Sequence, residues 1–356
     1  MTATKELAPI SNPAAWTGAE MRARPDWLIE LTVQDIAEIE AAMRRTGGHD
    51  LLAIDRDAFL LPTLGPRLLA IRDELVWGRG FVQLRGLPVE RWSRRDTAAA
   101  YWGIGTHLGR AVSQNASGHV LGHVRDLGLS ADDPDARVYQ TTARQFFHTD
   151  SCDIVGLLCL RTAKRGGLSC LVSSVTVFNE MLARRPDLAA ELMNPVCVDR
   201  RGEAHPDGRG WWRAAVFNLV RGHLITIYTR RYIESAQRFP EVPRLTPAYC
   251  AALDLFDAIC EEPAIRLEIE FRPGDIQFLC NHPILHDRTA FEDWPDPERK
   301  RHLLRLWLCP PIGRELPPDF AARYGSIEIG NRGGIAAPGM KLVAPLTPGS
   351  VPGCST

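Results

Sequence analysis

A histidine and an aspartate two positions apart form the sharpest chemical feature of the sequence, Phe147-His148-Thr149-Asp150. We predict that this segment starts a strand, where alternate side chains share a face, so that the His148 imidazole and the Asp150 carboxylate converge on one ion. Two neutral nitrogens and one carboxylate make the facial triad of non-haem iron(II) sites, whose open positions accept a 2-oxo acid and dioxygen. Because this spacing also arises by chance, the prediction depends on a third ligand.

The third ligand is expected in residues 281–291, where a histidine follows an apolar run and precedes an arginine. His286 is the predicted ligand. His282 competes with it, but His282 stands beside Pro283 in an expected turn. Either histidine is alternatively a hydrogen-bonded residue of the core.

Two arginines on one face of a predicted strand, residues 301–308, bring positive charge toward the same region. Arg301, Arg305 and Trp307 share that face because side chains alternate along a strand. A planar guanidinium holds a carboxylate with two parallel hydrogen bonds, so Arg301 suits the distal carboxylate of 2-oxoglutarate and Arg305 suits an anionic group of the substrate. The alternative is that one or both arginines pair with structural acids or extend to solvent.

Three blocks of the chain, FFHTDSC, the Gly166-Gly167-Leu168-Ser169 turn, and ILHDRTAF with RHLLRLWL, together resemble the taurine dioxygenase (TauD/TfdA) family, including its clavaminate synthase relatives. The resemblance spans residues 80–311. It implies that His148, Asp150 and His286 bind iron, that Arg301 binds 2-oxoglutarate and that Arg305 faces the substrate. Ser169 stands where the family often has a threonine that also contacts 2-oxoglutarate; the alternative is an ordinary strand serine.

The resemblance implies an Fe(II)- and 2-oxoglutarate-dependent dioxygenase that hydroxylates a small anionic molecule, such as an amino acid or another carboxylate, with release of succinate and CO2. The presence of Asp150 disfavours halogenation, because related halogenases lack this carboxylate. Desaturation or cyclisation by the same cofactors stays open. Two other classes are weighed against an oxygenase: a non-enzymatic jelly roll that binds a metal or ligand, and a zinc hydrolase, in which the two arginines would have no role.

The elements that must position these residues are read from periodicity and from turn and cap residues. Strands with irregular spacing predict a mainly β fold with flanking helices, built on a double-stranded β-helix (jelly roll, cupin-like) core. Helices are expected at 32–45, 66–77, 175–192 and 247–261, a hairpin at 214–228, and strands at 80–87, 265–271, 276–280 and 302–309.

Three regions are expected along the chain. Residues 1–79 form an N-terminal helical arm packed on the core, residues 80–311 form the oxygenase core with helical insertions, and residues 312–356, rich in proline and glycine, form a C-terminal arm or tail. With 45% hydrophobic residues, the 356-residue chain has the composition of a globular protein with a large core.

Charge and cysteine content limit the kinds of ligand and cross-link that the sequence predicts. The formal net charge is −1 without basic or acidic blocks, which disfavours nucleic acid and membrane surfaces and favours a small-molecule substrate, with dioxygen as the second reactant. Nine cysteines occur singly without a C-x-x-C pair, so neither a disulfide framework nor a zinc finger is predicted. The N-terminus lacks a signal-like apolar run, which predicts a cytoplasmic location. A homo-oligomer is compatible with the sequence.

Overall fold

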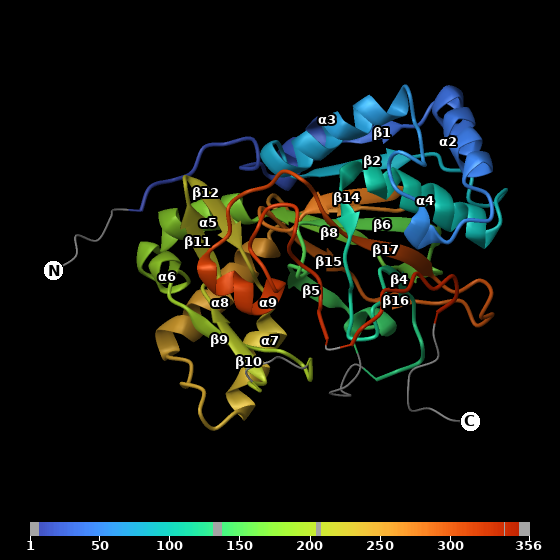
Figure 1. Cartoon of the computed structure of the whole chain (residues 1–356). Helices are drawn as coiled ribbons and strands as arrows, with labels where there is room; N and C mark the ends of the chain where they lie inside the picture. The colour runs from blue at the N-terminus through green and yellow to red at the C-terminus, as the bar shows by residue number, and fades with distance from the viewer. Residues whose placement is uncertain (1–6, 131–136, 204–207, 338, 349–356) are drawn as a thin grey trace.

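Two β-sheets lie face to face between two groups of helices (Figure 1). The computed structural model describes residues 7–130, 137–203, 208–337 and 339–348. Each sheet has one face toward the other sheet and one face toward helices. This arrangement confirms the predicted fold class, a mainly β fold of the double-stranded β-helix type with flanking helices.

The larger sheet has seven strands in the described part of the chain, in the order β1-β2-β14-β6-β17-β3, with β4 also paired to β17. All neighbours are antiparallel except β1 and β2. The strands are β1 (Leu28–Glu30), β2 (Phe81–Arg85), β3 (Arg110–Ala111), β4 (Leu121–Val124), β6 (Ile154–Arg161), β14 (Ile276–Cys280) and β17 (His302–Cys309). The predicted strands 276–280 and 302–309 are confirmed, as is a strand within 80–87.

The smaller sheet runs β13-β8-β15-β5 and carries the two histidines of the predicted triad. Its strands are β13 (Leu267–Ile269), β8 (Ser169–Ser173), β15 (Ile284–Arg288) and β5 (Gln145–His148). Three strand pairs lie beside it: β7 (Arg165–Gly166) with β16 (Phe291–Glu292), β9 (Val196–Asp199) with β10 (Trp211–Ala214), and β11 (Phe217–Val220) with β12 (His223–Thr226). The β11–β12 hairpin was predicted, and it turns through Arg221 and Gly222 at φ 47° and 82°.

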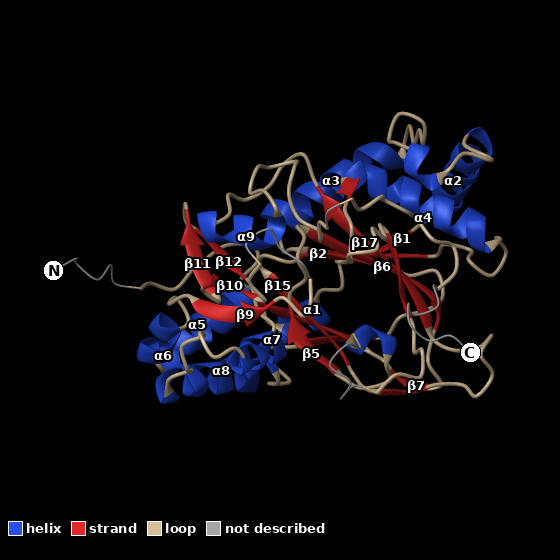
Figure 2. Cartoon of the chain, turned by 60° about the horizontal axis from the view of Figure 1, so that its bottom comes forward, coloured by secondary structure: helices blue, strands red, loops and turns tan. Residues whose placement is uncertain are grey.

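Helices cover the outer face of each sheet, as Figure 2 shows. The group on the larger sheet is α2 (Val33–Arg45), α3 (Leu64–Trp77) and α4 (Arg94–Leu108), and the group on the smaller sheet is α5 (Ser174–Arg184), α6 (Pro186–Glu191) and α8 (Pro247–Cys260). Shorter helices are α1 (Gly18–Ala23), α7 (Arg230–Ser235) and α9 (Ala321–Tyr324). Among the described residues, no helix is long and apolar enough to cross a membrane.

Cap residues set the helix ends where the sequence predicted them. Thr32 and Asp35 form a capping box at the start of α2, and Thr246 caps α8, whose first residue is Pro247. The helix predicted at 175–192 is instead two helices, α5 and α6. They break at Pro186, which cannot donate a backbone hydrogen bond and restricts the residue before it.

The space between the sheets is filled by apolar side chains from both. Phe81, Val155 and Trp307 of the larger sheet meet Leu171 and Ile284 of the smaller one in a buried cluster. These contacts hold the two sheets, and with them the predicted triad and the arginines of β17, in one rigid arrangement.

One local prediction was wrong. The His148–Asp150 segment was expected to start a strand, but His148 is the last residue of β5 and Asp150 lies beyond the strand. At this point the chain pairs with the segment before α7: His148 forms an isolated bridge with Thr229, and the Thr149 backbone N–H donates to the Tyr228 carbonyl (2.8 Å). The division into an N-terminal arm, a core and a C-terminal arm stays a prediction.

Candidate metal centre and cosubstrate cavity

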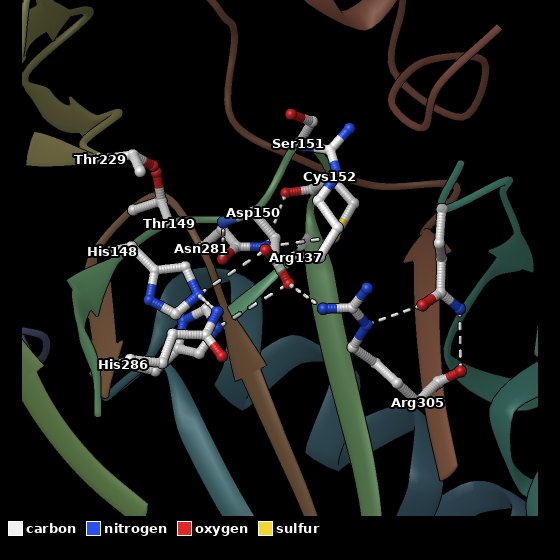
Figure 3. Close-up of polar contacts among 12 residues, drawn as sticks. Arg137, His148, Thr149, Asp150, Ser151, Cys152, Thr229, Asn281, His286 and Arg305 are labelled. Carbon is white, nitrogen blue, oxygen red and sulfur yellow. Dashed lines mark hydrogen bonds and ion pairs between the residues drawn. The ribbon is translucent and has the colours of Figure 1, made fainter. Parts of the chain in front are cut away.

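Three side chains meet at one edge of the smaller sheet: His148 at the end of β5, His286 in the middle of β15, and Asp150 just past β5 (Figure 3). His148 and His286 are direct cross-strand partners, and their ring centroids lie 4.1 Å apart. One oxygen of Asp150 is 3.8 Å from His148 Nε2 and the other is 3.8 Å from His286 Nε2. One donor atom of each residue lies within 4.8 Å of the other two.

Backbone and side-chain contacts fix the position of Asp150. Its N–H donates to Asn281 Oδ1 (3.0 Å), and its Oδ2 accepts a hydrogen bond from Trp307 Nε1 (2.9 Å). Asn281 follows β14 and Trp307 lies in β17, both strands of the larger sheet. The larger sheet therefore orients the carboxylate of Asp150, which follows β5 of the smaller sheet. The centre therefore depends on both sheets.

The protonation states suit metal binding. The Nδ1 of His148 donates to the Phe146 carbonyl (2.8 Å), so the lone pair is on Nε2, which lies 2.8 Å from the Gln145 side-chain amide. Burial lowers the pKa of His286 to about 3, so this imidazole is neutral at ordinary pH. Burial raises the pKa of Asp150, but Arg305, the two histidines and the hydrogen bond from Trp307 together outweigh burial and hold the pKa below its usual value of 3.8.

The donor set fits iron(II). Two imidazole nitrogens and one carboxylate, with donor atoms within 4.8 Å of one another, match the protein ligands of a facial triad, which leaves positions open for other ligands. The competing histidine, His282, lies outside this group. Its Nε2 is 2.7 Å from Asp153 Oδ1, and it is fully buried in a polar cluster with Arg332, which matches the alternative of a core histidine.

A narrow cavity begins at the two histidines and is lined by Ser169, Arg301 and Arg305. The Arg301 side chain is buried, with only 4% of the residue exposed, and its Nη1 has no hydrogen-bond partner. Burial lowers the pKa of Arg301 to about 10, so its charge persists at neutral pH. Ser169 Oγ donates to Gln277 Oε1 at 2.9 Å. A buried cation without an anion fits the distal carboxylate of 2-oxoglutarate.

A glycine makes room for this arginine. Gly167, in the predicted Gly-Gly turn, has φ 71°, and a Cβ at this position would lie 3.0 Å from Arg301 Nε. Both the left-handed backbone and the close approach require glycine.

Arg305 lies between the metal site and the larger of the two cavities. Its Nε donates to Gln114 Oε1 (2.7 Å), its Nη1 lies 3.5 Å from Asp150 Oδ2, and its guanidinium lies 4.8 Å from the centre of the Tyr139 ring. Figure 3 shows the guanidinium directed at the Asp150 carboxylate. Arg305 therefore contacts Asp150 and also lines the large cavity.

The large cavity has a volume of about 810 Å³ and opens beside His148 and Asp150. Its walls come from residues 137–144, β5, β9, β10, α7, α8 and the C-terminal segment. Glu203 joins two of these walls, because it accepts hydrogen bonds from Arg137 Nη2 (2.8 Å) and from Arg323 Nη1. Arg323 Nε also donates to Ser151 Oγ (2.7 Å), next to Asp150.

Several residues of the site were not selected from the sequence. They are Gln114, Tyr139, Arg288 and Glu203, which line the two cavities. Arg288 had a usable signal, because it stands two positions after His286 in a strand and must share its face. Burial, and then the charge of Arg301, lower the pKa of Arg288 to about 9.

Comparison with known sequences identifies the family of this chain. Residues 48–307 match the family described as taurine catabolism dioxygenase TauD, TfdA family. FR-33289 synthase of Streptomyces rubellomurinus is 31% identical, covering 89% of this chain and 95% of that protein. The taurine hydroxylase-like protein SAT17 of Stachybotrys chartarum is 29% identical, covering 87% of this chain and 84% of that protein.

A solved structure shares the fold. Asparagine oxygenase, in complex with Fe(II), 2S,3S-3-hydroxyasparagine and succinate, superimposes with a TM-score of 0.61 at 17% identity, over 79% of this chain and 93% of that one. The family match covers most of the chain, so an enzyme is confirmed over a non-catalytic jelly roll. The chain belongs to the TauD, TfdA family and is a non-haem iron dioxygenase that depends on 2-oxoglutarate.

Proposed function

We propose that His148, Asp150 and His286 are the three protein ligands of the iron, and that Arg301, with Ser169, binds the distal carboxylate of 2-oxoglutarate. One observation carries this proposal: the three donor groups converge within 4.8 Å, and two of them, His148 and His286, line a cavity that also holds an unpartnered, buried guanidinium nitrogen of Arg301. A 2-oxo acid with a distal carboxylate suits a site that has metal ligands and a buried guanidinium in the wall of one cavity.

The proposed substrate is a small anionic molecule, such as an amino acid or another carboxylate, that binds in the large cavity with its anion near Arg305. The support is that Arg305 lines this cavity beside Asp150 and that asparagine oxygenase, which has the same fold, holds a hydroxylated amino acid. We propose hydroxylation as the outcome. A cytoplasmic location stays a prediction from the sequence.

In this proposal, residues of the chain hold the iron ligands and the substrate in position. Trp307 and Asn281 hold the Asp150 carboxylate toward the two imidazoles, and Phe146 fixes the His148 ring. When bound, iron and 2-oxoglutarate activate dioxygen, with release of succinate and CO2, for the oxidation of a substrate C–H bond. Arg305 would select which C–H bond faces the metal by holding the substrate's charged end.

The cofactor assignment is tested by visible spectroscopy of the anaerobic protein with iron(II), followed during titration with 2-oxoglutarate. A weak charge-transfer band is expected for the chelated complex. His148→Ala should abolish the band, and Arg301→Gln should shift its appearance to higher 2-oxoglutarate concentration. Arg314→Gln is the matched control, because Arg314 is also a buried arginine with an unpartnered Nη1 but lines neither cavity. A wild-type titration in Arg301→Gln would contradict the assignment.

The substrate assignment is tested by succinate release in the presence of amino acids and matched carboxylates, each compared with its neutral amide. Substrates with the anion should stimulate release, and Arg305→Gln should raise their KM. Product mass then separates the outcomes, since hydroxylation adds one oxygen atom, whereas desaturation and cyclisation remove two hydrogens. Equal stimulation by acid and amide would reject the anionic substrate class.

A further inference from the structure

A second arginine, Arg288, lines the same narrow cavity as Arg301. Arg288 is the last residue of β15, two positions after His286, so both side chains lie on the face of the strand that looks into the cavity. The residue is 7% exposed. The wall of this cavity therefore contains the guanidinium groups of both Arg288 and Arg301.

Neither guanidinium has an acidic partner. Arg288 donates from Nη1 to the Thr141 carbonyl (3.1 Å) and from Nη2 to the Ala143 carbonyl, and its Nε has no partner. Within the described ranges, no carboxylate forms an ion pair with Arg288 or Arg301. Their guanidinium carbons lie 4.7 Å and 5.3 Å from the centre of the Phe291 ring.

Two buried like charges side by side are unfavourable unless an anion lies between or beside them. The carbonyls of Thr141 and Ala143 solvate the far edge of the Arg288 guanidinium but supply no negative charge. Arg305, the third arginine at this cavity, is already bound to Gln114 and Asp150. The excess charge thus belongs to the pair formed by Arg288 and Arg301.

We propose that Arg288 is a second cationic anchor for the distal carboxylate of 2-oxoglutarate, acting together with Arg301. This inference rests on the proposed role of Arg301. It makes the cavity selective for a dicarboxylic 2-oxo acid over a 2-oxo acid with an apolar tail. The alternative is a structural role, in which Arg288 only fastens the backbone of residues 141–143 beside β5.

Binding calorimetry with the full chain loaded with Mn(II) in place of iron distinguishes these roles without turnover. The two ligands are 2-oxoglutarate and 2-oxopentanoate, which chelates in the same way but has a methyl group in place of the distal carboxylate. Arg288→Gln should weaken 2-oxoglutarate about tenfold to a hundredfold, the effect of losing a hydrogen bond to a charged group, and leave 2-oxopentanoate unchanged. Arg314→Gln should change neither affinity.

Arg288→Lys guards against a folding defect. Lysine keeps the charge but cannot hold two carbonyls in a planar fork, so this variant should retain most of the preference for 2-oxoglutarate. Equal weakening of both ligands in Arg288→Gln, or no weakening of either, would overturn the inference. Arg301→Gln distinguishes a failure of this inference from a failure of the proposed function. If Arg301→Gln loses the preference for 2-oxoglutarate over 2-oxopentanoate while Arg288→Gln keeps it, only the inference about Arg288 is wrong. If both variants keep that preference, the proposed role of Arg301 is wrong as well.

Discussion

Replacing Trp307 by phenylalanine tests whether the larger sheet positions the proposed carboxylate ligand. The change removes a 2.9 Å hydrogen bond from Nε1 to Asp150 Oδ2 while it keeps an aromatic ring at a site that is 4% exposed. A hydrogen bond to a charged group contributes about 1.5–3 kcal/mol. Loss of an outer hydrogen bond to a metal ligand lowers metal affinity by about tenfold to a hundredfold, which is the same range.

The assay is a titration of the metal-free protein with iron(II) or Mn(II), with urea denaturation of the same preparations to measure stability. Trp102→Phe is the matched control, because Trp102 is 6% exposed and donates a 2.9 Å hydrogen bond to the Ile54 carbonyl, far from the site. Both variants should lose stability, by about 1–3 kcal/mol. Only Trp307→Phe should lose metal affinity. If both variants bind metal as the wild type does, Trp307 does not orient a ligand and the reasoning is refuted.

Two further changes test the polar clusters around the site. Asp153→Asn leaves the buried Arg332 without its 2.7 Å ion-pair partner, so the free energy of unfolding measured in urea should fall by about 3–5 kcal/mol. Although burial raises the pKa of Asp153, hydrogen bonds from His282 and Arg332 hold it below 3.8. The stability from its charge is therefore present above pH 3.8 and lost as the pH falls below that value, a loss that the variant should not show. Glu203→Gln weakens the contact with Arg323, so backbone amides of α9 should exchange hydrogen faster than in the wild type; unchanged exchange would mean that the contact does not hold the C-terminal segment.

Strands that are buried on both faces were the most predictable elements. β14 and β17 have the predicted bounds because apolar runs of strand length, ended by polar or turn residues, are typical of central strands. The break between α5 and α6 was missed because the apolar periodicity continues across Pro186, although that proline was a usable signal. Periodicity reports which face is buried and is silent on whether the backbone is continuous.

The polar partners of the site were less predictable because they come from distant parts of the chain. Gln114 and Arg305, which form a 2.7 Å hydrogen bond, are 191 positions apart. Glu203 accepts hydrogen bonds from Arg137, which is 66 positions away in the sequence, and from Arg323, which is 120 positions away. Such pairs are set by how loops pack over the sheets, and no local pattern records them. Residues that share a strand face, such as His286 and Arg288, follow from alternation alone.

The error about the His148–Asp150 segment has a geometric reason that concerns metal binding itself. Side chains two positions apart in a strand are separated by about 6.6 Å at their bases and run parallel. The donor atoms of the centre lie within 4.8 Å of one another, and His148 and His286 already occupy neighbouring positions across the β5–β15 pair. A carboxylate that stayed on the strand would stand beside the imidazoles and not across from them. The chain must therefore leave the sheet directly after His148, so that Asp150 approaches both Nε2 atoms from a third direction, and Trp307 and Asn281 must supply the orientation that the strand no longer gives.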